Sequence, residues 1–291
     1  MKKKNLSGYL FIAPNMIGVI IFFVIPFCFS LVLAFSSWNH LEGLSSIRFI
    51  GLDNFGRMFS DDWFKDSFVN NIIYSFVGVP IAIFIAMILS PILNDKVFGK
   101  GILRACYFIP YITNGIAIAF VWMLLFQPRL GPINGFLRSI GISNPPEWLA
   151  STTWALPALI IINIWATVGY NIIIYVAALQ GLSHEIYEAA DLDGATGVRR
   201  FFSITMPLLT PSTFFLLTTG IITSFKVFGI VQALTQGGPV TATTVLGYYI
   251  YLTAFRYYDM GYASAISWVL FALIFLVTLI QFRLQKKWVN Y

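Results

Sequence analysis

Long apolar runs alternate with short polar segments along almost the whole chain. Six runs are long enough to cross the hydrocarbon core of a bilayer as helices, which takes about 20 residues. They extend approximately over residues 9–36, 68–93, 101–126, 153–179, 208–231 and 261–281. Prolines inside three of them, Pro26, Pro80 and Pro110, are compatible with helices because neighbouring helices satisfy the freed carbonyls. The pattern predicts an all-α, multi-pass membrane protein with six transmembrane helices in a single domain, residues 1–291.

The composition supports the membrane class. Hydrophobic residues make up 58% of the chain and charged residues 10%, and the mean hydropathy is +0.80. A soluble domain carries about 25% charged residues, so a large soluble core is excluded. The net charge of +6 is divided into short clusters between apolar runs, which favours membrane orientation over nucleic-acid binding. Cys28 and Cys106 both lie in apolar runs and are interpreted as small apolar side chains.

The first apolar run follows Lys2, Lys3 and Lys4, as the core of a signal peptide would. It is far longer than the roughly 7–15 residues of such a core. We therefore expect a retained transmembrane helix.

Lysines and arginines are unequally divided between the two sides that six helices create. The side that holds both termini carries eleven of them and the opposite side six. Because positive residues mark the cytoplasmic face, we expect both termini and the polar segment 181–207 to be cytoplasmic. On the external side we predict a short helix near 133–140 and an amphipathic stretch at 246–258.

The polar segment 181–207, between the fourth and fifth runs, has the local signals of an elbow. Ser183 can cap a helix whose first turn contains Glu185, and Gly194 can take the left-handed conformation that ends it. Thr196 can cap a second short helix, and Pro207 stands at the entrance to the fifth run. The alternative is a solvated loop. We favour two short helices whose apolar faces pack against another protein.

The same segment contains a spaced motif: Glu188, Ala189 and Ala190, then Asp193, Gly194 and Ala195, and finally Phe201, Ile204 and Pro207. This motif resembles the EAA loop of ATP-binding-cassette (ABC) importer permeases. Met206 stands where leucine is usual, and Ser183 replaces an expected proline. Residues 9–26, 234–255 and 261–274 also resemble the carbohydrate-import branch, related to the maltose system.

The resemblance implies a transport subunit of a bacterial plasma (inner) membrane rather than an enzyme. The first elbow helix would be a coupling helix that docks on a cytoplasmic ATPase. Two copies of that ATPase, a second permease and an external solute-binding protein would complete the complex, with ATP and Mg bound by the ATPase. The chain itself has no G-x-x-x-x-G-K-[ST] phosphate loop, and no cofactor is expected on it. The ATPase-coupling residues implied are Glu188, Ala189, Ala190, Asp193, Gly194, Ala195, Phe201 and Pro207.

Polar residues within two runs are candidates for a substrate path. Asn163, Thr167 and Tyr170 share one helical face at i, i+4 and i+7, with Asn171 beside it. In the fifth run the candidates are Gly220, Thr223 and Ser224. Amides, hydroxyls and an aromatic ring suit a neutral, hydroxyl-rich ligand, and the resemblance implies a di- or oligosaccharide. The alternative is that these residues only join helices.

Lys226 is the only basic residue that lies well inside a predicted span. We favour snorkelling to the external surface. If it faced the substrate, a glycerol-phosphate-like polyol ester would become the better ligand, which is our second hypothesis for the substrate.

Other function classes find little support. The spans contain no H-E-x-x-H motif, no paired carboxylates and no Ser–His pair, so a membrane enzyme is not expected. An ion-coupled carrier usually has titratable groups in the membrane, whereas every carboxylate here lies outside the predicted spans. His40 and His184 have no metal-like companions, and no metal site is predicted.

Overall fold

A computed structural model describes residues 4–94 and 99–290. The described residues are mostly helical, as predicted, with one two-stranded antiparallel pair, β1 (Ser36–Ser37) and β2 (Arg48–Phe49). The chain divides into two compact units. The first consists of the residues up to Asp62 and of Tyr249–Phe271, and the second of Trp63–Tyr248 and the residues from Ala272 on. Lys2, Lys3 and Lys96, which contribute to the predicted orientation, lie outside the described residues.

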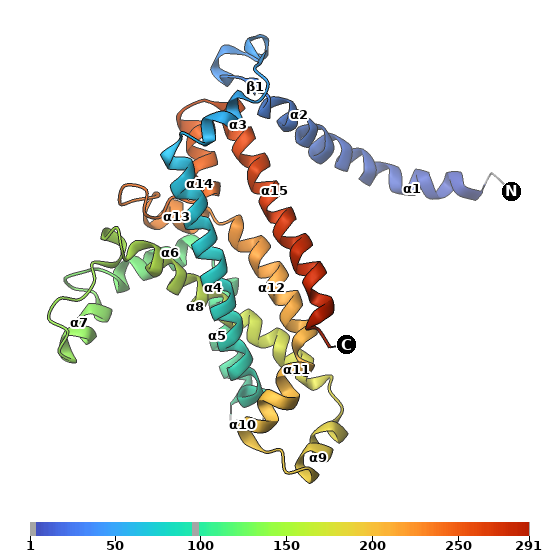
Figure 1. The fold of residues 1–291 in the computed structure, drawn as a ribbon, viewed down its shortest axis with the longest axis vertical. Coiled ribbons are helices and arrows are strands. Elements are labelled where there is room, and N and C mark those ends of the chain that lie inside the picture. The colour runs from blue at the N-terminus through green and yellow to red at the C-terminus, as the bar shows by residue number, and fades with distance from the viewer. Residues whose placement is uncertain (1–3, 95–98, 291) are drawn as a thin grey trace. The chain divides into compact units, whose positions relative to one another are not determined.

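The first unit begins with a helical run, and Figure 1 labels its main elements. Its elements are α1 (Lys4–Val19), the π-helical turn η1 (Ile20–Val24), α2 (Ile25–Ala34), the 3₁₀ turns η2 (His40–Glu42) and η3 (Leu44–Ser46), α3 (Asp53–Met58), the end of α14 (Leu246–Tyr251), the π-helical turn η6 (Leu252–Arg256) and the start of α15 (Met260–Leu284). The span Gly8–Ala34 is unbroken, which confirms the first predicted helix. The π-helical turn ends shortly before Pro26, where no N–H is available for the regular ladder.

A polar cluster holds the first unit together. The carboxylate of Asp61 accepts hydrogen bonds from the hydroxyls of Tyr249 and Tyr262, at 2.5 and 2.6 Å. Arg57 lies 4.1 Å above the Tyr262 ring and makes a 2.6 Å ion pair with Asp259. Burial, followed by the bond to Asp61, raises the pKa of Tyr249, so this phenol stays a protonated donor. The cluster joins the segment after α3 to α14 and α15.

The second unit contains the remaining elements, and the elbow helices α9 and α10 form one of its ends (Figure 1). They are α4 (Asp62–Asn94), α5 (Lys100–Ile112), α6 (Gly115–Leu125), α7 (Pro132–Ser139), η4 (Trp148–Ala150), α8 (Ala155–Gln180), α9 (His184–Leu192), α10 (Gly197–Arg200), η5 (Phe201–Thr205), α11 (Met206–Leu208), α12 (Thr210–Phe225), α13 (Gly229–Leu234) and η7 (Gln285–Lys287). The continuous helices α4, α8 and α15 confirm the second, fourth and sixth predicted spans, and α7 confirms that a short helix forms near 133–140. Which side of the membrane each end faces stays a prediction.

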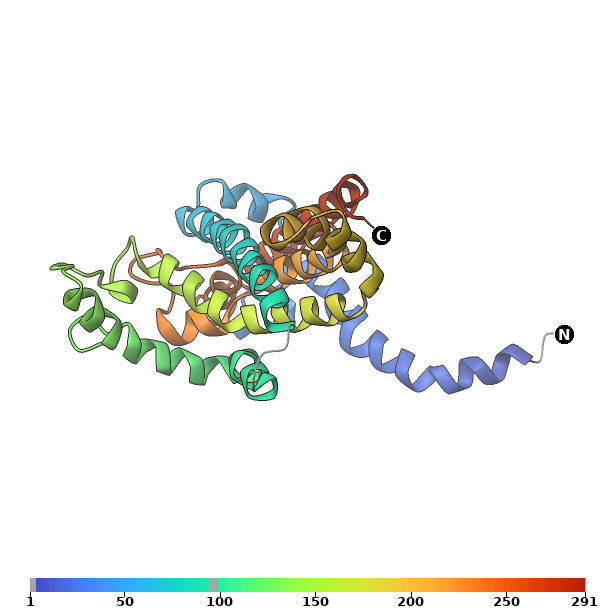
Figure 2. The ribbon, with the colours of Figure 1, turned by 90° about the horizontal axis from the view of Figure 1, so that it is seen from below.

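The third predicted span is not one helix, which corrects the sequence prediction. The axes of α5 and α6 differ by 101°, and the bend can be followed in Figure 2. Thr113 and Asn114 have extended backbones, and the Asn114 side chain accepts a 2.8 Å hydrogen bond from the N–H of Ile116. An asparagine in this role starts a new helix. The apolar run therefore holds two short helices.

The fifth predicted span is also shorter and bent. A 64° bend separates Gly197–Leu208 from Thr210–Phe225, and α12 ends at Phe225 rather than near Val231. A side chain of α4 contacts the C-terminal end of α12: Asn71 Nδ2 donates a hydrogen bond to the Phe225 carbonyl at 3.4 Å. Asn71 Oδ1 accepts from the N–H of Leu246 at 3.0 Å, so one buried amide links the end of α12 to the start of α14. With two bent pairs and four unbroken helices, the described residues give six spans when each pair counts as one.

Candidate functional site

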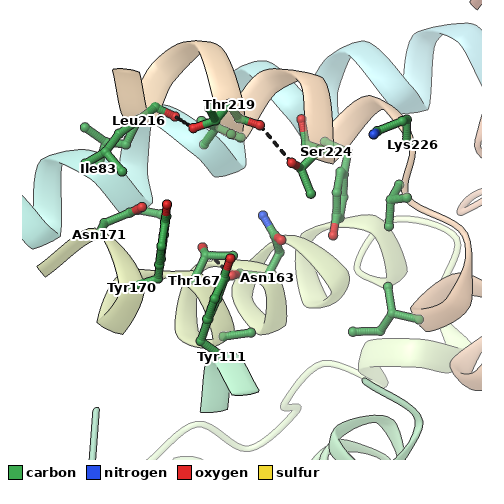
Figure 3. Close-up of a pocket in the computed structure, with 18 residues that line it drawn as sticks. Ile83, Tyr111, Asn163, Thr167, Tyr170, Asn171, Leu216, Thr219, Ser224 and Lys226 are labelled. Carbon is green, nitrogen blue, oxygen red and sulfur yellow. Dashed lines mark hydrogen bonds between the residues drawn. The ribbon is translucent and has the colours of Figure 1, made fainter. Parts of the chain in front are cut away.

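A cavity of about 400 Å³ lies between α4, α8 and α12 in the second unit. Tyr111 from α5 and Ile230 from α13 complete its wall. A space of this size matches the smaller ligand pockets of proteins, which measure about 300–1,000 Å³. Figure 3 shows α8 on one side of this space and α12 on the other.

The candidate substrate-path residues predicted from helical spacing all line this one cavity. They are Asn163, Thr167, Tyr170 and Asn171 on α8, and Gly220, Thr223 and Ser224 on α12. The i, i+4, i+7 spacing places the α8 set on one face, and packing turns that face toward the corresponding face of α12. Their role in substrate binding stays a prediction.

The threonine and serine hydroxyls of the set are bonded within their own helices. Thr167 donates to the Asn163 carbonyl at 2.7 Å, Thr223 to the Thr219 carbonyl at 2.8 Å, and Ser224 to the carbonyl of Ile221 at 2.9 Å. None of these three bonds joins two helices, so they do not support the interpretation of these hydroxyls as joints between helices. Their oxygen lone pairs remain available to accept hydrogen bonds.

The direct polar joint between α8 and α12 lies at other residues. The hydroxyls of Tyr175 and Thr213 are 2.8 Å apart, and Tyr175 is fully buried. The helix contact therefore has its own hydrogen bond. This leaves the cavity residues free for another role.

An aromatic wall stands at one side of the cavity (Figure 3). The rings of Tyr111 and Tyr170 stack nearly parallel, with centroids 4.5 Å apart and planes 14° from each other. Tyr111 is 45% exposed, so part of its ring surface is open. Sequence reasoning missed Tyr111, because it lies on α5 and only the packing of α5 on α8 places it here.

Glycines set the spacing around the amide of Asn163. A Cβ added to Gly78 on α4 would lie 3.2 Å from Asn163 Nδ2, so the glycine leaves room for the amide. A Cβ on Gly220 would lie 2.8 Å from Cγ1 of Val79. Gly220 thus lines the cavity chiefly by allowing α12 to approach α4.

Lys226 also lines the cavity, contrary to the snorkelling that the sequence favoured. It follows the last residue of α12 instead of lying inside a span. In Figure 3 its ammonium nitrogen turns back toward Ser224. The early end of α12 causes the difference, since a side chain at a helix end is not confined to a lipid-facing flank.

The predicted elbow is present as α9, a tight turn and α10. Ser183 Oγ accepts from the N–H of Glu185 at 3.3 Å, and Gly194 has φ +70°, as expected. The N–H of Ala195 bonds to the Ala190 carbonyl at 2.8 Å and that of Gly194 to the Asp191 carbonyl at 3.1 Å. This pair of bonds is the Schellman C-cap.

The alanines of the motif have a place in that cap. Ala190 and Ala195 are 4% and 9% exposed, in the positions whose apolar contact usually accompanies a Schellman motif. Glu188, Ala189 and Asp193 are exposed instead. The motif therefore combines a buried structural half with a solvent-exposed half.

The second arm of the elbow differs in detail from the prediction. Thr196 stands at the N-cap of α10, but its side chain makes no capping bond. Phe201 and Ile204 lie in the π-helical turn η5, and Pro207 lies in α11. The chain thus continues as helix through η5 and α11, then bends by 64° into α12.

Charged and apolar groups surround the elbow. Arg200 makes a 3.0 Å ion pair with Asp191 and lies 5.8 Å from the Tyr187 ring centroid, tying α10 to α9. These residues and Glu188 border a hollow of about 490 Å³ that reaches the ends of α4 and α8. Leu192 is 90% exposed and Val198 73%. Sequence reasoning did not single out these two apolar residues, although both stand within the polar segment.

Among the residues that the structure describes, no three His, Cys, Asp or Glu side chains come together as metal ligands would. Cys28 and Cys106 are both free thiols.

The chain is similar over its length to known permeases. Residues 62–290 match the family described as binding-protein-dependent transport system inner membrane component. Probable ABC transporter permease protein YesP of Bacillus subtilis (strain 168) is 37% identical, and the match covers 100% of this chain and 94% of YesP. The sn-glycerol-3-phosphate transport system permease protein UgpA of Agrobacterium fabrum is 34% identical, covering 97% of this chain and 96% of UgpA.

The fold also matches solved structures. A chain in the crystal structure of a bacterial ABC transporter involved in the import of the acidic polysaccharide alginate has a TM-score of 0.82 at 23% identity, covering 99% of this chain and 98% of that one. A second structure, of a bacterial alginate ABC transporter with an alginate pentasaccharide-bound periplasmic protein, gives 0.83 at 23% identity and covers 98% of this chain and 96% of that one. The chain therefore belongs to the family of binding-protein-dependent transport system inner membrane components and is a permease subunit of an ABC importer.

Proposed function

We propose that this permease carries a hydroxyl-rich solute, a sugar or short oligosaccharide, through the cavity between α4, α8 and α12. The observation that supports this is the convergence of amides, hydroxyls and a stacked tyrosine pair on one cavity. Asn163 and Asn171 can donate and accept hydrogen bonds, the hydroxyl oxygens can accept them, and the Tyr111 ring offers a flat surface. A solute with many hydroxyls makes full use of such a surface.

The proposed orientation places both termini and the elbow on the cytoplasmic side of a bacterial plasma membrane. The greater share of lysines and arginines lies on that side of the six-span arrangement. An external solute-binding protein then delivers the solute to the opposite face. The family description, which names binding-protein-dependent transport, supports this part of the proposal.

The energy source in this proposal is a separate ATPase, present in two copies and bound to ATP and Mg. The elbow docks on it through α9, with Glu188 at the contact and exposed Leu192 as an apolar anchor. A second permease subunit completes the path. Movement of the ATPase then reaches α12 through α10, the second arm of the elbow, and through η5 and α11, which continue α10 without a non-helical break.

Copurification from the native membrane in mild detergent tests the elbow. We expect an ATPase to be recovered with the wild-type chain and with Glu147→Ala, whose glutamate lies between α7 and α8, in a loop that the proposed orientation makes external. Glu188→Arg is expected to lose it. Recovery of the ATPase with Glu188→Arg would contradict docking at α9.

Growth on defined carbon sources tests the solute. A strain that lacks this chain is expected to lose growth on one of a panel of di- and oligosaccharides. Wild type and Thr278→Ala should restore it, since Thr278 bonds within α15 outside the cavity. Asn163→Leu should not. Retained growth on every sugar of the panel would contradict the proposed solute class while leaving the ATPase result unaffected.

A further inference from the structure

One side chain in the lining of the cavity carries a charge. Of the 18 residues that line it, Lys226 is basic and none is an aspartate or glutamate. The described part of the chain gives Lys226 no ion pair, and its side chain is exposed. The wall therefore has a net charge of +1 that nothing in the lining neutralises.

The position of Lys226 follows from the early end of α12. Phe225, the last helical residue, has its carbonyl held by Asn71, and Lys226 takes a non-helical conformation with φ −91° and ψ 11°. The helix dipole favours a lysine at a helix C-terminus, whichever way the lysine side chain points. The dipole alone does not explain why the ammonium turns toward Ser224 and the cavity (Figure 3).

Neutral hydrogen-bonding groups accompany this charge. The side-chain amide of Asn163 makes no hydrogen bond in the described residues, and it shares the cavity wall with Lys226. An ammonium offers three donors and no acceptor. An ammonium beside amide donors and hydroxyl oxygens is suited to a solute that has several hydroxyls and one anionic group.

We propose that the transported solute is anionic, with one carboxylate or phosphate group that Lys226 binds and hydroxyls that Asn163 and Ser224 bind. This inference rests on the proposed function, since it assigns a charge to the same solute. Attraction to the single ammonium gives anions an advantage over neutral solutes of the same shape. Two unit charges about 4 Å apart attract enough for roughly a fivefold preference even in bulk water, and more where water is excluded.

Charged thiol reagents report the electrostatic potential in the cavity, and this measurement does not require the solute to be known. The complete importer complex is placed in lipid nanodiscs with Cys28→Ser and Cys106→Ser as background and Thr223→Cys as reporter. Modification rates are compared for the anionic sulfonatoethyl and the cationic trimethylammonioethyl methanethiosulfonates. Protection of the reporter is then measured with galacturonate against galactose and with glycerol 3-phosphate against glycerol.

We expect Lys226→Met to lower the anion-to-cation rate ratio at least about fivefold. Lys226→Arg should keep the ratio, as should Lys286→Met, whose lysine does not line the cavity. The anionic member of one pair should protect the reporter at least about fivefold better than its neutral partner, and this preference should vanish in Lys226→Met. Protection by galacturonate identifies a carboxylate solute, and protection by glycerol 3-phosphate a phosphate.

Other outcomes overturn the inference in separable ways. An unchanged rate ratio, or equal protection by neutral and anionic solutes, refutes the anionic solute and leaves the proposed sugar path standing. Loss of the second permease from Lys226→Met complexes would show that the lysine pairs with a partner's carboxylate, which also refutes it. A reporter that no reagent reaches, with or without ATP, contradicts the cavity as a solute path and so refutes the proposed function itself.

Discussion

The backbones of α5 and α8 approach closely at Gly169 on α8, and replacing this glycine should open the cavity wall. A Cβ at this position would lie 1.6 Å from the carbonyl oxygen of Tyr107 and 2.5 Å from its carbonyl carbon. Ordinary contacts begin near 3.4 Å, so Gly169→Ala requires α5 to move away by about 1.8 Å. The atoms that clash belong to the backbone, and no rotamer change relieves them.

The energetic cost follows from two losses. Overpacking of this kind costs about 1–3 kcal/mol. The stack of Tyr111 on Tyr170, next to Gly169 along the chain, is worth about 0.5–1.5 kcal/mol beyond buried area. A total of about 1.5–4.5 kcal/mol corresponds to a fall in melting temperature of about 2–7 °C for a chain of 291 residues.

Thermal unfolding of the purified chain in detergent measures this, with two matched variants. Gly220→Ala meets only the Val79 side chain, at 2.8 Å, and should cost less. Gly115→Ala has no heavy atom within 4 Å of the new Cβ and should leave the melting temperature unchanged or slightly raised. Tyr107→Ala should not rescue Gly169→Ala, because the clash is with the backbone. Equal melting temperatures for Gly169→Ala and Gly115→Ala would refute the close approach.

Three further substitutions test the turn of the elbow, the Asn71 hydrogen bonds between α4, α12 and α14, and the polar cluster around Asp61. Gly194→Val forces a β-branched residue to φ +70°, which should cost about 1–3 kcal/mol and uncouple ATP hydrolysis from uptake; normal coupled uptake would contradict the proposed role of the turn. Asn71→Leu leaves the N–H of Leu246 unpaired, so the free energy of unfolding should fall by about 1–3 kcal/mol. An unchanged value in thermal or denaturant unfolding would argue against a structural role for the Asn71 hydrogen bonds. Tyr249→Phe removes one of two hydroxyl donors to Asp61 and should lower stability by about 1.5–3 kcal/mol, measured in the same way, with full stability as the contrary result.

Much of the secondary structure could be predicted because its signals are local. Apolar length alone locates α4, α8 and α15, and a serine, a glycine and the spacing between them locate the elbow. The two errors have one cause. Hydropathy reports which residues avoid water but not the direction of the helix axis, so 101–126 reads as one span although Asn114 starts a new helix there.

The candidate site was predictable to the extent that it lies on faces of single helices. The spacing of Asn163, Thr167 and Tyr170 fixes their common face whatever the fold. Tyr111 and Lys226 were missed or misplaced, because their positions depend on other segments. The close packing of α5 on α8 at Gly169 brings Tyr111 to Tyr170. The side chain of Asn71 binds the carbonyl of Phe225, where α12 ends just before Lys226.

Local sequence signals were sufficient to predict the membrane class, the six apolar runs, the elbow and the polar faces of two helices. Each depends on interactions between residues near one another in the chain, or on transfer from water, which is a property of composition. The tertiary structure decided where two spans bend, which faces meet around the cavity and that its wall includes a cation. These depend on close approach of segments distant in sequence, as at Gly169 and Tyr107, where the absence of one Cβ allows two backbones to touch.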